Sequence, residues 1–142
     1  EDPKNVKMQE ATANYDYYTR FYVWNEDANG LSSLGSETND DGIMDVKVIG
    51  DERIEFFEDG ELMFTGTNLQ EQNGGFTFDI QSQTMNDAKL GEVKVRGYNH
   101  YRELGGEAQG LYAYTGDYMN VGLLVEVEDL EIILLIDFRK KD

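Results

Sequence analysis

The sequence predicts an all-β domain: an antiparallel barrel of eight or nine strands, with a β-sandwich as the alternative. Three observations favour this class. Apolar and charged residues alternate with a period of two in several runs, as in strands with one buried face. Turn signals rich in Gly and Asp separate these runs, and helical periodicity is minor. The length of 142 residues fits a single domain over 1–142 with one core.

Nine runs are predicted to be strands. In one of the clearest, Met44, Val46 and Val48 alternate with charged residues. The last run, 130–138, is apolar on both faces in its middle, so it is expected to be central or covered on its second face. In chain order, the predicted strands are about 15–24, 43–49, 52–58, 61–67, 75–81, 90–98, 108–114, 119–128 and 130–138.

The connections favour a barrel over a sandwich. Glu58-Asp59-Gly60-Glu61 predicts a tight hairpin, because Gly60 accepts the positive φ that such turns need. Most connections join sequence neighbours, which is typical of an up-and-down meander, and closure removes exposed edges. Helix is expected only as short turns near 84–89 and 99–104. An eight-stranded barrel is either filled by side chains or just able to hold one small ligand.

Composition excludes several classes of function. Twelve Lys and Arg against 29 Asp and Glu give a net charge of −17, which argues against binding to nucleic acid or to an anionic membrane surface. The absence of Cys excludes thiol catalysis and Cys-type zinc sites, and a single His excludes a two-His metal site within one chain. No apolar run approaches the ~18 residues of a membrane helix. Because the sequence begins at Glu1, we expect a processed chain.

The stretch ERIEFFEDGELMFTG, from Glu52 to Gly66, resembles the hairpins of small bacterial lipocalin-like (calycin) β-barrel domains. The resemblance covers only this hairpin. The Gly-x-Trp signature of lipocalins is missing, since Trp24 is preceded by Tyr22 and Val23. The resemblance implies a closed barrel and an extracytoplasmic location, whether secreted, periplasmic or lipid-anchored.

Two acidic segments have the spacing of calcium loops. Calcium takes six to eight hard oxygen ligands, with a Gly to turn the backbone. The first segment runs from Asn25 to Gly30, with oxygen-bearing residues at loop positions one, three and five. The second, Glu37-x-Asn39-x-Asp41-Gly42-Ile43-x-Asp45, resembles the calcium loops of thrombospondin type 3 and dockerin-like repeats.

Neither segment is complete as an EF-hand, because Ser36 and Val48 stand where the bidentate Glu would be. The alternative is a long acidic loop at about 25–43, in which Asn, Asp and Gly are ordinary turn residues. If Ca²⁺ binds, the candidate ligands are Asp27, Asn29, Glu37, Asn39, Asp41 and Asp45.

Aromatic residues form two groups, one in the predicted strand 15–24 and a second, of tyrosines, between residues 98 and 118. Tyrosine offers a flat apolar face with a polar rim, which suits a binding pocket, although the same residues also serve in ordinary packing. The candidate ligand-binding residues are Tyr98, Tyr101, Tyr112, Tyr114 and Tyr118.

No residue is assigned a catalytic role. His100 fits a solvated loop residue better than a general base. With 29 acidic residues, some carboxylate pair occurs at any chosen distance, so pairing carries no information. We therefore expect a non-enzymatic extracytoplasmic domain that holds a small apolar or aromatic-compatible ligand in a barrel mouth. The alternative is a calcium-stabilised structural or adhesive module using the 25–45 loop. The expected partners are a small molecule or a protein.

Overall fold

The computed structural model describes residues 11–27, 29–34, 39–72, 74–100, 108–113 and 115–141. These residues form strands and connecting turns, with no helix among them, so the predicted all-β class is confirmed. No described segment is a helix of the length and apolarity that crossing a membrane requires. The strands are β1 (Ala11–Asn25), β2 (Gly30–Ser33), β3 (Asn39–Ile49), β4 (Arg53–Glu58), β5 (Glu61–Gln72), β6 (Gly75–Ile80), β7 (Gln83–Asp87), β8 (Gly91–Gly97), β9 (Gly110–Ala113), β10 (Tyr118–Val127) and β11 (Leu130–Lys140).

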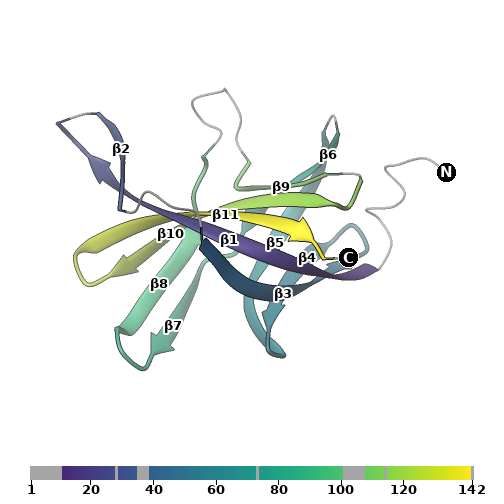
Figure 1. Ribbon diagram of the computed structural model, residues 1–142, viewed down its shortest axis with the longest axis horizontal. Coiled ribbons are helices and arrows are strands. Elements are labelled where there is room, and N and C mark those ends of the chain that lie inside the picture. The colour runs from purple at the N-terminus through teal and green to yellow at the C-terminus, as the bar shows by residue number, and fades with distance from the viewer. Residues whose placement is uncertain are drawn as a thin grey trace.

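Eight of these strands close a barrel, in the order β11-β1-β3-β4-β5-β6-β9-β10 (Figure 1). Pairing of β10 with β11, from Tyr118 opposite Arg139 to Val127 opposite Leu130, closes the ring. All pairings are antiparallel, and barrel neighbours follow chain order once β2 and the β7–β8 hairpin are set aside. The predicted up-and-down barrel is therefore the observed one.

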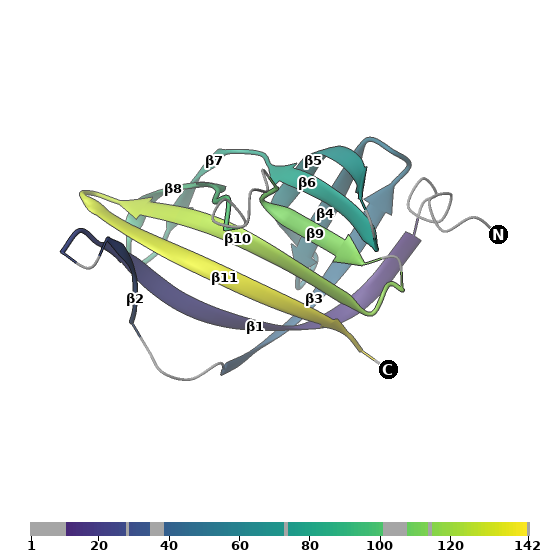
Figure 2. The same cartoon turned by 90° about the horizontal axis from the view of Figure 1, so that it is seen from above.

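Three further strands extend the wall beyond the barrel. β2 pairs with β1, β8 pairs with the second half of β10, and β7 pairs with β8. The turns of the β1–β2, β7–β8 and β10–β11 hairpins lie at the same end of the molecule, far from both chain termini (Figures 1 and 2). At this end the barrel wall opens into a broader sheet.

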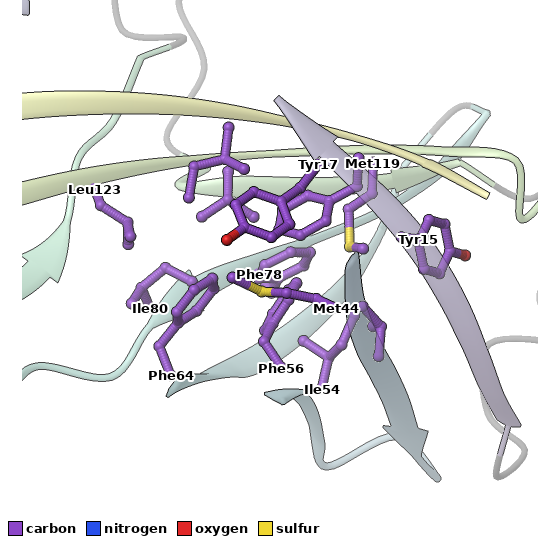
Figure 3. Close-up of a cluster of buried hydrophobic side chains, with 14 of the residues drawn as sticks. Tyr15, Tyr17, Met44, Ile54, Phe56, Phe64, Phe78, Ile80, Met119 and Leu123 are labelled. Atoms are coloured by element: carbon purple, nitrogen blue, oxygen red, sulfur yellow. The ribbon is translucent and has the colours of Figure 1, made fainter. Parts of the chain in front are cut away.

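Large side chains occupy the middle of the barrel (Figure 3). Phe56 is fully buried, and its ring stacks on Phe64 in the paired strand, with centroids 4.4 Å apart. The ring of Phe138 lies 5.3 Å from Phe56 and that of Phe78 lies 6.1 Å from it. Burying each such side chain contributes about 1.5–3 kcal/mol, so this cluster is the main source of stability. Other members of this core cluster are Tyr15, Tyr17, Met44, Val46, Ile54, Ile80, Met119, Val121, Leu123 and Ile136.

Glycine makes room for one of these rings. Gly66 in β5 and Gly110 in β9 flank β6, and a Cβ on either would lie within 2.6 Å of the Phe78 ring. Both positions therefore require glycine for packing, and the ring of Phe78 lies against bare backbone on two sides.

The structure differs from the sequence analysis in two places. Residues 83–87 form strand β7 instead of a helical turn, and Asp87 then accepts hydrogen bonds from the amides of Lys89 and Leu90 at 2.8 and 2.9 Å. These amides, Leu90 first, lower the pKa of Asp87. The expected long loop over 25–43 contains β2 and the beginning of β3. β2 forms because β1 continues past the barrel rim and offers an edge to pair with. The other expected helical turn, 99–104, lies mostly outside the described residues.

β11 is covered on both faces, as its apolar middle predicts. Ile136 and Phe138 point into the barrel core, whereas Ile133, on the opposite face by strand alternation, is only 3% exposed.

Candidate functional site

Strand pairing in the barrel wall is interrupted beside β10, between β8 and β9, and we call this interruption the seam. β8 and β9 pair with the same edge of β10, one after the other: Gly97 lies opposite Leu123, and Gly110 lies opposite Val121. Between these pairs, Gly122 accepts a hydrogen bond from the Tyr98 amide at 2.9 Å and donates one to the Gln109 carbonyl at 2.8 Å. The chain thus leaves the sheet at Tyr98 and returns at Gln109, at the same point of β10.

On the other side of the seam, the successive strands β6 and β7 pair with different strands. β6 pairs with β9 as far as Phe78 opposite Gly110, whereas β7 pairs with β8 from Gln83 opposite Val95. In the gap, the side-chain oxygen of Gln109 accepts a hydrogen bond from the Ile80 amide at 2.7 Å. A Cβ on Gly97 would lie 1.7 Å from that oxygen, so the glycine leaves space for the Gln109 side chain. One side chain thus bonds to the backbone where the strand pairing is interrupted.

A cleft of about 460 Å³ opens at this seam. A second hollow of about 290 Å³ adjoins it, and the two share Ser82 and Arg96. We call the two together the seam groove. The larger hollow is lined by Ile80, Ser82, Arg96, Gly97, Tyr98, Asn99, Gln109 and Leu124, and the smaller one by Ser82, Gln83, Thr84, Lys94, Val95, Arg96 and Glu126.

Cations and carboxylates lie side by side at the groove. Lys94 and Arg96 lie on the same face of β8, directly opposite Glu126 and Leu124 of β10. Arg96 Nη2 contacts Glu126 Oε1 at 3.0 Å and Glu131 Oε2 at 3.6 Å. Two cations and one carboxylate thus line the groove, with Glu131 beside it, so the local charges nearly balance within a chain of net charge −17.

The predicted tyrosine set does not converge on one pocket. Tyr98 lines the seam groove. Tyr112 belongs to the other face of the wall, since it pairs with the buried Met119 and stacks on Phe76 with centroids 4.9 Å apart. Tyr118 donates a hydrogen bond to Asp137 Oδ1 at 3.1 Å, and chiefly partial burial raises its pKa. Tyr101 and Tyr114 lie outside the described residues.

The predicted calcium ligands do not form one site in the described part of the chain. Asp27 and Asn29 lie in the turn between β1 and β2, where Asn29 has a φ of 49°. Asp45 lies in β3 opposite Asn14, eleven residues before Asn25 on β1, which is roughly 36 Å of strand. Glu37, and the side chains of Asn39 and Asp41, lie outside what the structure describes. Among the described residues, no three His, Asp or Glu side chains are grouped to hold a metal ion.

Two polar pairs outside the groove contain a titratable side chain. His100 Nε2 lies 3.0 Å from Asn120 Oδ1, and its ring packs close to Gly122. Tyr17 donates a hydrogen bond to Glu58 Oε2 at 2.5 Å beside Gly42. Each pair joins strands or connections of the wall, and neither lines the seam groove.

Sequence reasoning missed most of the groove. Lys94 and Arg96 are read as the solvated side of a strand, Gln109 as part of the predicted strand 108–114 and Ser82 as a connection residue, because no local motif marks them. Only the alternation of Lys94, Arg96 and Tyr98 on one face was visible in the sequence.

Searches of protein-family models, curated proteins and solved structures find no match to this chain. The function is therefore inferred from the site itself.

Proposed function

We propose that the protein is a non-enzymatic binding domain that holds a small ligand with an apolar or aromatic face in the seam groove. The observation that carries this proposal is the position of the groove. Aromatic and aliphatic side chains occupy the barrel centre, whereas the cleft at the seam is an open hollow of about 460 Å³. Small-ligand pockets usually measure about 300–1,000 Å³.

The lining also has the composition of a ligand site. Ile80, Tyr98 and Leu124 supply apolar contact, and Ser82, Asn99 and Gln109 supply hydrogen-bonding groups. The Gln109–Ile80 hydrogen bond and the paired Arg96 guanidinium hold the walls in place before a ligand arrives. Such preorganisation lowers the entropic cost of binding.

A fragment screen by NMR tests the proposal. A set of small aromatic and cyclic aliphatic fragments is titrated into ¹⁵N-labelled protein, and amide shifts are mapped onto the structure. We expect the largest shifts at Arg96, Gly97, Tyr98 and Leu124. The variant Leu124→Trp fills the groove and abolishes these shifts, whereas Leu62→Trp, at an exposed position in β5, leaves them intact. Shifts confined to other surfaces, or no binding by any fragment, would overturn the proposal.

A further inference from the structure

We infer that the ligand of the seam groove is a neutral saccharide. This inference rests on the proposed function, because it names the ligand class of the same groove. It follows from three properties of the groove: charge, hydrogen-bonding pattern and shape.

Charge excludes the ionic classes. The net charge of −17 disfavours the approach of anions to this chain. Lys94, Arg96 and Glu126 line the groove, and Glu131 contacts Arg96 from beside it, so there is no surplus carboxylate to bind a cation. A neutral ligand matches this balance.

The polar groups of the groove are complementary to a ligand that both donates and accepts hydrogen bonds. The guanidinium of Arg96 only donates and the carboxylate of Glu126 only accepts, while Ser82, Thr84 and the Asn99 amide do both. A sugar hydroxyl has the same dual capacity, and neighbouring hydroxyls on a ring can meet the planar guanidinium and carboxylate together. A wholly apolar ligand would remove these groups from water without offering them hydrogen bonds, at a cost in affinity.

The shape of the groove suits a ring with an apolar face. Tyr98 and Leu124 lie in the larger hollow, and the C–H face of a sugar ring packs well against an aromatic or aliphatic side chain. From Lys94 to Tyr98 the groove follows one face of β8 and its continuation for roughly 13 Å. That length accommodates more than one sugar ring, so an oligosaccharide should bind better than a monosaccharide.

The experiment titrates ¹⁵N-labelled protein with trisaccharides of three charges. Maltotriose, cellotriose and the N-acetylglucosamine trimer are neutral, trigalacturonate is anionic and the glucosamine trimer is cationic. We expect at least one neutral trisaccharide to shift the amides of Arg96, Tyr98 and Leu124, and the corresponding monosaccharide to bind more weakly. Arg96→Leu and Glu126→Gln should each weaken binding by roughly tenfold or more, because each removes a charged hydrogen-bonding partner.

The matched control is Arg53→Leu. Arg53 also contacts two carboxylates, Glu52 at 3.3 Å and Glu55 at 3.1 Å, but it lies in β4 and does not line the groove. Its replacement should leave saccharide binding unchanged. Groove shifts caused only by the charged trimers, shifts that survive Arg96→Leu, or no binding by any neutral trisaccharide would overturn the inference. If fragments still bind the groove in that case, the proposed function stands and only the ligand class is wrong.

Discussion

The side chain of Gln109 hydrogen-bonds the backbone amide of Ile80 across the seam of the barrel wall, at 2.7 Å. The Gln109 amide also donates to the Phe78 carbonyl at 3.1 Å, so this residue bonds to β6 through both its backbone and its side chain. The barrel stays joined here although β8 has diverged from β6. The seam groove is the hollow that this divergence leaves.

Replacing Gln109 by Ala should destabilise the protein by about 1–3 kcal/mol, since the amide of the buried Ile80 loses its partner. Urea denaturation followed by tryptophan fluorescence measures the change. Gln70→Ala, at an exposed position in β5, is the control and should stay within about 0.5 kcal/mol of the parent. Equal stabilities for the two variants would show that the Gln109 hydrogen bond does not hold the seam.

Gly97→Ala should act through Gln109. The added Cβ would lie 1.7 Å from the Gln109 side-chain oxygen and displace it from Ile80. The double variant Gly97→Ala, Gln109→Ala should therefore be less destabilised than the sum of the two single variants, because both remove the same hydrogen bond. Additive losses in the denaturation curves would mean that the two residues act independently.

Phe56→Ala should cost about 3–5 kcal/mol of unfolding free energy, because Phe56 is fully buried against three other rings. Phe21→Ala is the comparison, since that ring is 39% exposed and the loss should be far smaller. Chemical denaturation of both variants gives the two values. Similar losses would contradict the placement of the core.

Tyr15 should make stability fall at alkaline pH. Its hydroxyl donates to the Gly116 carbonyl at 2.7 Å, and chiefly burial raises the pKa of Tyr15 well above its ordinary value near 10. Below pH ~10 the phenol is protonated in both states, so the stabilisation is complete; above it the unfolded chain loses the proton first, and stability declines. Tyr15→Phe should cost about 1 kcal/mol at neutral pH and make the decline above pH 10 less steep. Denaturation midpoints between pH 8 and 11 test this, and an unchanged alkaline slope would count against it.

The barrel itself was predictable because its signal is local. Runs such as Met44 to Val48 alternate because each strand has one face in the core, and hairpin turns such as Asp59-Gly60 join sequence neighbours. All nine predicted strands exist. β2 and β7 were missed because they are short and carry little apolar alternation; they pair only with a neighbour that extends past the barrel rim.

The seam groove was not predictable in the same way. It depends on Ser82, Arg96, Gln109 and Leu124, which lie far apart in the sequence and meet only because β8 and β9 share one edge of β10. Of the five tyrosines proposed as a pocket, Tyr98 reaches the groove, whereas Tyr112 points to the opposite face. Strand alternation assigns those two residues to opposite faces of the wall only when the registers of β8 and β9 with β10 are known.

The most direct test of the binding proposal is a crystal of the protein soaked with a mixture of small aromatic and cyclic fragments. We predict fragment density in the seam groove, in contact with Tyr98 and Leu124, with the packed rings around Phe56 undisturbed. Density among those rings in the barrel centre, with the groove left empty, would contradict it.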